Sequence, residues 1–321
     1  MNATRRTALG LAATGLLARP ALAQPGGKSV LLIVPFAPGG PTDLIARRLA
    51  LGLGEPLGQM VLVENRPGAG GNNGAEFVAR SAPDGQTILF GTSGPLAINR
   101  MLYPGQAYDP VRDFAPIAPL GRIPNVLAVN AQIPARSVPE LIALAQKEKL
   151  SFGSSGNGAS SHLAGALFNR MAGTSIEHIP YRGTGPALND LLAGHIGMVF
   201  TDVLTALPHL QAGRARGIGV TTLERSAVLP DLPTVAEQGL PGYDASVFFG
   251  LAVAAATPEP LRDRLRAAFA SAVDQPETRR FLESQGMQVA PEMTGPALST
   301  LMASETARWE RVIREASVRA D

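Results

Sequence analysis

Short apolar runs alternate with segments of helical periodicity along almost the whole chain, and this alternation limits the fold more than any other feature. The strand-like runs are residues 30–34, 61–64, 87–91, 126–129, 150–152, 197–200, 217–221 and 248–254. The segments with helical spacing are residues 44–53, 74–81, 95–101, 138–147, 161–172, 185–192, 261–274 and 296–317. Such alternation is typical of α/β folds with largely parallel sheets. We therefore expect an α/β protein.

Two glycine-rich loops follow apolar runs and lead directly into helix starts. The first, residues 35–43, reads PFAPGGPTD, and the second, residues 153–162, reads GSSGNGASSH. A helix N-terminus leaves backbone N–H groups without intrahelical acceptors and carries partial positive charge. It can therefore hold an anion without any Lys or Arg. Two such loops in two separate lobes predict a cleft that clamps a small carboxylate.

The first 23 residues have the pattern of an export signal. Arg5 and Arg6 form a basic start, residues 7–18 are largely apolar, and residues 21–23 read ALA, a small-x-small cleavage site. We expect cleavage after Ala23. The paired arginines fit the twin-arginine route, but ordinary signals also begin with two basic residues, so both routes stay open. No later stretch approaches the ~20 apolar residues that span a bilayer.

Removal of this segment changes the charge balance. It takes Arg5, Arg6 and Arg19 from the 28 basic residues and leaves 25 against 26 acidic ones, a formal net charge of −1. The sequence pI of 9.2 is therefore no evidence for a nucleic-acid partner, and we expect none. The chain contains no cysteine, which excludes disulfides, thiolate metal sites and cysteine nucleophiles.

The length and the placement of proline predict two lobes. A mature chain of about 298 residues exceeds the usual single domain of roughly 100–150 residues. We interpret the proline-rich residues 108–124 as the approach to a crossing between lobes. The predicted first lobe is discontinuous, residues 24–124 plus 247–321 with the last helix packed back on it, and the second is residues 125–246. Repeated crossings favour closure by bending at a hinge.

Several short motifs occur in a characteristic order. They are VPFAPGGPTD at 34–43, VENRPGAGG at 63–71, APDG at 82–85, YDP at 108–110, HIPYRG at 178–183, LPDLPT at 229–234 and GLPGY at 239–243. In this order and spacing, the chain resembles the extracytoplasmic solute receptors of tripartite tricarboxylate transporters, also called the Bug family. The similarity runs through nearly the whole mature chain.

The resemblance implies a two-lobed type II periplasmic-binding-protein fold with a cleft between the lobes. It also implies a small carboxylate ligand held between the two glycine-rich loops, and delivery to the permease subunits of a membrane transporter. We expect a periplasmic monomer without metal or cofactor. This chain departs from the family at Phe248, where tryptophan is usual, and at the strand end Phe200-Thr201-Asp202, where Phe-Asp is common. The ligand that a relative binds therefore does not identify the ligand of this chain.

The candidate ligand-binding residues lie on the glycine-rich loops, at strand ends and at helix starts. They are Phe36, Pro38, Gly39, Gly40, Asp43, Thr92, Ser93, Ser154, Ser155, Gly156, Ser160, Ser161, His162, Tyr181, Thr184, Phe200, Thr201, Asp202 and Phe248. Glycine lets the backbone approach a ligand closely, and the carboxyl end of a strand is a suitable edge for a cleft. Hydroxyl and N–H groups would bind the carboxylate, and aromatic rings would form the pocket walls.

Most of these candidates also have a structural alternative. Asp43 lies in the first turn of its helix, where a carboxylate complements the dipole; if it faced the cleft, it would favour amino acids over plain acids. One of the serines at 154, 155, 160 and 161 is expected to be a helix N-cap. His162 also fits a structural role, Arg182 fits an ion pair as well as a ligand cation, and Asn99 is a weaker candidate. Every phenylalanine also fits a buried core, and Trp309 is expected to serve packing.

No catalytic motif is present. Residues 91–95 and 153–157 miss the spacing of a nucleophile elbow, and the four histidines show no zinc-ligand spacing. Residues 68–73 fail the dinucleotide fingerprint. We therefore predict a binding protein without catalytic residues. The alternative function is a periplasmic co-receptor that docks on a histidine-kinase ectodomain, since both functions need the same two-lobed receptor.

Overall fold

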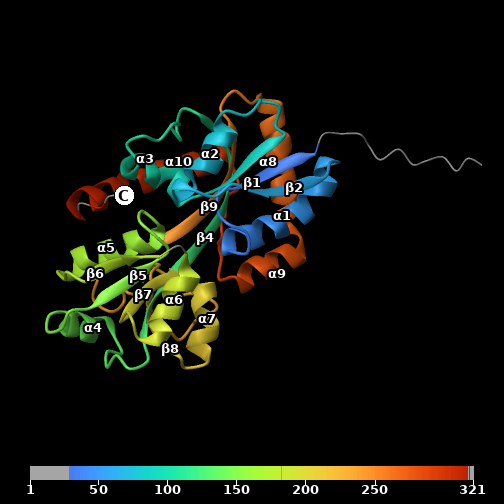
Figure 1. Cartoon of the computed structure of the whole chain (residues 1–321). Coiled ribbons are helices and arrows are strands. Elements are labelled where there is room, and N and C mark those ends of the chain that lie inside the picture. The colour runs from blue at the N-terminus through green and yellow to red at the C-terminus, as the bar shows by residue number, and fades with distance from the viewer. Residues whose placement is uncertain (1–28, 182, 317, 319–321) are drawn as a thin grey trace, which may run out of the picture.

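The structure is a computed structural model that describes residues 29–181, 183–316 and 318 (Figure 1). The strands are β1 (Val30–Val34), β2 (Val61–Asn65), β3 (Thr87–Thr92), β4 (Phe114–Asn130), β5 (Ser151–Ser154), β6 (Glu177–Pro180), β7 (Met198–Asp202), β8 (Ala215–Val220), β9 (Ser246–Ala254) and β10 (Gln288–Val289). They follow the order β2-β1-β3-β9-β4-β7-β5-β6, and β8 and β10 also pair with β4.

The helices cover both halves of this sheet. They are α1 (Pro41–Leu57), η1 (Ala69–Gly71), α2 (Asn72–Ala79), η2 (Gly94–Ile98), α3 (Asn99–Leu102), α4 (Val138–Ala145), α5 (Ser160–Ala172), α6 (Thr184–Ala193), α7 (Val203–Gln211), α8 (Glu259–Asp274), α9 (Pro276–Ser284) and α10 (Gly295–Ala316). Figure 1 shows one group of elements around β1–β3, α1, α2 and α8, and a second around β5–β8 and α4–α7, with β4 and β9 running between them.

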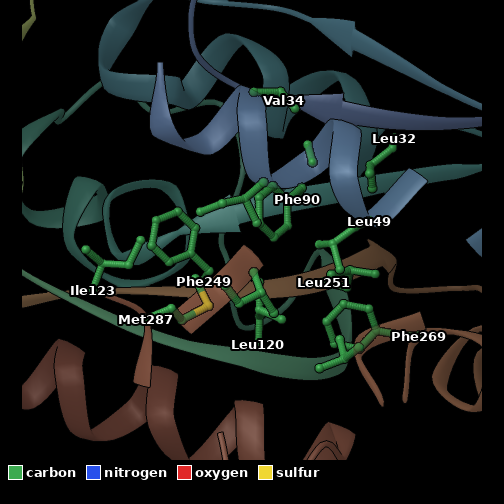
Figure 2. Packing of buried hydrophobic residues seen from close by; sticks show 14 of the residues in the cluster. Leu32, Val34, Leu49, Phe90, Leu120, Ile123, Phe249, Leu251, Phe269 and Met287 are labelled. Carbon is green, nitrogen blue, oxygen red and sulfur yellow. The ribbon is translucent and has the colours of Figure 1, made fainter. Parts of the chain in front are cut away.

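The first half of the sheet is mixed. β1 pairs in parallel with β2 and β3, whereas β9 is antiparallel to both β3 and the first half of β4. Apolar side chains from β1, α1, β3, β9 and α8 meet in the core of this half (Figure 2). Phe90 and Phe249 stack there with ring centroids 5.7 Å apart. This burial fixes the strands whose ends carry the candidate site.

The second half is built around β4 and β5. β7 and β8 are antiparallel to β4, and β5 is parallel to β6 and β7. The expectation of largely parallel sheets is therefore wrong for the strands next to β4 and β9. These two strands carry the chain between the halves in opposite directions, and their pairing is antiparallel.

Residues 114–124 of the proline-rich passage belong to a strand. Residues 114–130 form one continuous strand, although the sequence led us to expect the approach to a crossing up to residue 124. The register with β9 shifts between Pro116 and Ala118 and again between Pro119 and Gly121. Proline donates no ladder hydrogen bond and is tolerated at such irregularities. β4 therefore itself carries the chain from the first half to the second.

Besides the short η1 and β10, three elements were not predicted from the sequence because their local signals are weak. β6 is short and half polar, α7 contains Pro208 inside the helix, and α9 is rich in charged residues. The last helix packs on η2 of the first half, as expected, and also on α5 of the second half. The export segment 1–23 and Ser317 lie outside the described residues. Among the described helices, none is both long and apolar enough to cross a membrane.

Candidate functional site

The carboxyl ends of four strands point toward the middle of β4. β3 ends at Thr92, which lies beside Phe249, and Phe249 in turn lies beside Gly121 of β4. β7 runs in the opposite direction and ends at Asp202, beside Asn125 of β4. β1 is parallel to β3, and β5 is parallel to β7. The loops that follow β1, β3, β5 and β7 therefore face the same section of β4, which is where open α/β sheets bind ligands.

The loop after β1, residues 35–40, is held in shape by Asp43. The Asp43 carboxylate accepts hydrogen bonds from the Gly39 N–H (2.9 Å), from Arg47 Nε (2.9 Å) and from Asn65 Nδ2 (3.0 Å). Asn65 Nδ2 also donates to the Phe36 carbonyl, and Asp43 is only 2% exposed. Burial alone would raise the pKa of Asp43, but these hydrogen bonds outweigh it and hold the pKa below its usual value. The contacts favour the structural alternative for Asp43.

Replacing Asp43 by asparagine is expected to lower the free energy of unfolding by about 1–3 kcal/mol at pH 7. The amide keeps the shape of the side chain but loses the charge. Its NH2 group also replaces one of the two oxygens, so it faces either the Arg47 donor or the Asn65 donor. Urea unfolding measures the loss, with the exposed Asp231→Asn as the matched control. An Asp43→Asn variant as stable as the wild type would show that the carboxylate does not hold the loop.

The start of α1 leaves backbone donors uncapped. Gly40 is the N-cap residue, with φ −80° and ψ 170°, no side chain caps the helix there, and Pro41 occupies the first helical position. The N–H groups of Thr42 and Asp43 therefore have no intrahelical acceptor. A Cβ atom added to Gly40 would meet nothing closer than the Ala37 carbonyl at 3.9 Å, so the space beside the loop is open.

A third glycine-rich segment, residues 67–71, packs against this loop and was not among the candidates. A Cβ atom on Gly71 would lie 3.3 Å from Pro35 Cβ and 3.4 Å from Phe36 Cζ. Asn99 Nδ2 donates to the Gly70 carbonyl (2.9 Å) and to Asn72 Oδ1 (2.7 Å). The Tyr108 hydroxyl also lies 3.0 Å from Asn72 Oδ1. Asn99, the weaker candidate, thus belongs to a buried network that positions the loops.

Replacing Asn72 by alanine is expected to lower the free energy of unfolding by about 1–3 kcal/mol, because it takes the Oδ1 acceptor from Asn99 in a buried site, whereas Tyr108 keeps the Pro95 carbonyl as its acceptor. Ligand affinity should fall as well, since the segment that supports Pro35 and Phe36 loosens. Chemical unfolding and ligand titration measure both effects. Asn189→Ala, at an exposed position of α6, is the control, and an equal loss in both variants would argue against the network.

The loop after β5, residues 155–159, differs from the expectation at its cap. The N-cap residue of α5 is Ala159, without a side-chain cap, so the prediction that one of the serines is the N-cap is wrong. The reason is that Ser161 turns back to the loop, where its Oγ accepts the Ser155 N–H at 2.9 Å and lies 2.9 Å from Ser155 Oγ. The first N–H groups of α5, beginning at Ser160, thus have no side-chain cap.

A stacked pair of histidines contacts this second loop and the end of β5. The rings of His162 and His178 lie 3.7 Å apart between centroids and 7° from parallel. His178 Nε2 lies 2.6 Å from Ser154 Oγ, and His162 Nδ1 accepts the Gly158 N–H at 3.1 Å. Burial lowers the pKa of His162 to about 3, with a smaller contribution from His178, and burial lowers the pKa of His178 to about 4. Both rings are therefore neutral at pH 7.

The segment after β6 and the end of β7 complete the part of the candidate site that the second half carries. The Tyr181 N–H donates to the Ser154 carbonyl, and its hydroxyl donates to Asp190 at 2.7 Å; burial, followed by Asp190, raises the pKa of Tyr181 to about 12. Thr184 begins α6. Asp202 caps α7 by accepting the Thr205 N–H at 2.8 Å, and burial raises the pKa of Asp202 against the hydrogen bonds from Thr205. Arg182 lies outside the described residues.

Two buried hydroxyls at the strand ends have no hydrogen-bond partner. Ser93 Oγ follows β3, and Thr201 Oγ1 lies near the end of β7; the residues are 1% and 0% exposed. Unpaired buried hydroxyls are rare and mark places where a ligand or water completes the bonding. By contrast, Phe200 and Phe248 are buried within the core, whereas Phe36 is half-buried and Pro38 is exposed. The described residues contain no cluster of His, Cys, Asp or Glu suited to a metal.

Comparison with known proteins identifies the family. The model of the tripartite tricarboxylate transporter family receptor, TctC, matches residues 45–318, and the chain belongs to this family. It is 38% identical over 300 residues to a protein from the tcbD-tcbE intergenic region of Pseudomonas sp. (strain P51), covering 92% of this chain and 88% of that one. It is 34% identical to protein BugT of Bordetella pertussis over 98% of both chains.

Solved structures agree with this assignment. An R. palustris protein solved with adipate has a TM-score of 0.84 and 35% identity, covering 91% of this chain and 98% of that one. MatC from Rhodopseudomonas palustris with bound malate has a TM-score of 0.81 and 35% identity, covering 89% and 98%. The periplasmic binding protein BugD has a TM-score of 0.82 at 32% identity, covering 91% and 98%.

A more distant likeness supports the fold alone. PhnD1 from Prochlorococcus marinus, at 12% identity, has a TM-score of 0.58 and covers 90% of this chain and 98% of that one. The periplasmic-binding-protein fold and the family resemblance are thereby confirmed. The family consists of solute receptors, so the prediction of a binding protein rather than an enzyme is also confirmed.

Proposed function

We propose that this chain binds one small organic carboxylate between two lobes and delivers it to the permease subunits of a tripartite tricarboxylate transporter. The observation that carries the proposal is the pair of helix starts, at α1 and α5, that follow strands directed at the middle of β4 and carry no side-chain cap. Such N–H groups form charge-assisted hydrogen bonds to a carboxylate. Relatives solved with adipate and malate support this ligand class.

The proposed lobes are residues 24–124 with 247–321, and residues 125–246. These boundaries fall where β4 passes between the halves and where β9 begins. Here Pro124 pairs with Ser246, and Asn125 Nδ2 donates to the Ala245 carbonyl at 3.1 Å. Ligand binding would shift the population toward a closed state by bending at these two segments.

The contacts of Asp43 favour ligands that carry no ammonium group. Its carboxylate is engaged by Gly39, Arg47 and Asn65 and is therefore not free to bind an ammonium group. A plain di- or tricarboxylate is favoured over an amino acid. Ser93 and Thr201 carry the unpaired hydroxyls that we assign to the ligand or its waters. The mature receptor is proposed to begin after Ala23 and to act as a monomer in the periplasm.

A thermal-shift screen of residues 24–321 tests the proposal. The protein is unfolded and refolded to remove bound ligand and is then mixed with adipate, malate, tricarboxylates, acidic amino acids, aromatic acids and neutral amides. A ligand at ~100 times its Kd adds about 2.7 kcal/mol of stability. We expect shifts confined to acids that carry no ammonium group. Shifts with neutral or cationic compounds alone would overturn the proposal.

A further inference from the structure

A buried carboxylate on α10 accepts hydrogen bonds from three donors, one of which comes from the section of β4 that the candidate site faces. Glu305 is 2% exposed. Its Oε1 accepts Arg122 Nη2 at 3.0 Å, and its Oε2 accepts Arg308 Nη2 at 2.6 Å and Trp309 Nε1 at 2.9 Å. A buried carboxylate with this many charge-assisted bonds is strongly constrained in position. Trp309 is therefore more than packing, because its indole N–H fixes Glu305.

Two of the partners of Glu305 connect it to the segments that cross between the halves, Arg122 directly and Arg308 through Asp244. Arg122 lies in the middle of β4, and its Nη1 donates to Ser246 Oγ, the first residue of β9, at 3.0 Å. Arg308 Nη1 donates to the Asp244 carbonyl at 2.9 Å and pairs with the Asp244 carboxylate at 2.9 Å. One glutamate thus connects both crossing strands to a single helix.

The helix that carries Glu305 also touches both halves of the molecule. Its first turns pack on β9, where a Cβ on Gly250 would lie 2.7 Å from Leu298 Cδ1. Near its end, Glu315 pairs with Arg170 of α5 at 2.6 Å. In Figure 1, α10 lies beside α3 of one group and α5 of the other. A change in the angle between the halves must therefore strain or break contacts of α10.

We propose that Glu305, through Arg122 and Arg308, is a positioning residue that sets the range of angles between the two halves. Through these two arginines the carboxylate connects the paired ends of β4 and β9 to α10 and makes α10 a brace across the hinge. This goes beyond ligand recognition, because the effect exists without any ligand. When the brace is lost, the hinge samples a wider range of angles, and a smaller fraction of molecules has the geometry needed to bind.

The test measures the distance between the halves in the ligand-free protein. Because the chain has no cysteine, Leu51→Cys on α1 and Ala143→Cys on α4, both exposed helical positions, can carry spin labels for double electron–electron resonance. Glu305→Gln is introduced into this pair. Its amide cannot accept from Arg122 on one side and from Arg308 and Trp309 on the other, because one of its two atoms is a donor.

The expected result is a broader or displaced distance distribution in Glu305→Gln and an unchanged one in the control Glu310→Gln. Glu310 lies on the same helix but is exposed, and among the described residues its ion pair is with Arg314 of that helix. Circular dichroism verifies folding of each variant. If Glu305→Gln does not fold, Arg122→Gln removes the bonds of Arg122 to Glu305 and to Ser246, leaves the link of Arg308 to Asp244 in place, and is expected to broaden the distribution as well. A wild-type distribution in the folded variant, or an equal change in Glu310→Gln, would overturn the proposal.

Discussion

Replacing Gly40 by valine is expected to weaken carboxylate binding by at least about 100-fold, or roughly 2.7 kcal/mol, while leaving the fold intact. Gly40 has φ −80° and ψ 170°, which any residue adopts, and a Cβ there meets no atom closer than 3.9 Å. The backbone and a Cβ atom at this position are therefore free of strain. The added methyl groups occupy the space beside the uncapped N–H groups of α1, where the ligand carboxylate is proposed to lie. Calorimetric titration measures the loss.

Gly105→Val is the matched control for this experiment. A Cβ on Gly105 also meets nothing within 4 Å, and the residue lies in a turn after α3. Gly156→Val is less informative, since Gly156 has φ +130° and a Cβ there would lie 3.1 Å from the Tyr181 carbonyl. A Gly156 variant could lose binding through strain alone. Retained affinity in Gly40→Val would remove the first loop from the proposed site.

Stability is expected to fall by about 2–4 kcal/mol between pH 7 and pH 5, because His162 and His178 are buried as a neutral pair. Burial lowers their pKa values from 6.5 to about 3 and about 4, so in this range the unfolded chain binds protons that the folded one does not. The stability is complete above about pH 6.5 and is lost as the pH falls toward 4. Urea unfolding at a series of pH values measures the slope.

Two variants assign this slope to the stacked pair. His178→Gln keeps a polar group near Ser154 and removes one titrating ring, so its slope between pH 7 and pH 5 should be about half that of the wild type. His162→Gln removes the other ring and should reduce the slope by a similar amount. A flat wild-type curve over this range would mean that the rings protonate in the folded state as readily as in the unfolded one.

The local patterns of the sequence were sufficient for the fold class and for the two loops. Apolar runs found most strands within a residue or two, since burial and periodicity are properties of adjacent residues. Residues 126–129 of β4 were predicted as a strand, but residues 114–124 were not, because their prolines suggested the approach to a crossing; only pairing with β9 shows that they lie near register shifts. The serine cap at α5 was also misjudged, because Ser161 bonds to Ser155 rather than capping the helix.

Side-chain partners that are distant in the chain could not be read from the sequence. Asn72 meets Asn99 across 27 positions, and Arg122 meets Glu305 across 183. Asp43 was left between two alternatives, and its engagement by Asn65 became visible only once β1 and β2 were paired. His178 lay in a recognised motif, yet its stacking on His162 depends on β6 lying beside β5. These contacts arise from the packing of the fold.

Calorimetric titration of the refolded receptor with a plain dicarboxylate and with its neutral diamide tests the central claim most directly. The two compounds share size and shape and differ in charge, so the comparison isolates recognition of the carboxylate by the helix starts. Adipate or malate serves first, followed by any acid that the thermal screen selects. We predict one-to-one binding of an acid and no measurable heat with its diamide. Equal affinity for the diamide, or binding of neutral compounds alone, would contradict the assignment as a carboxylate receptor.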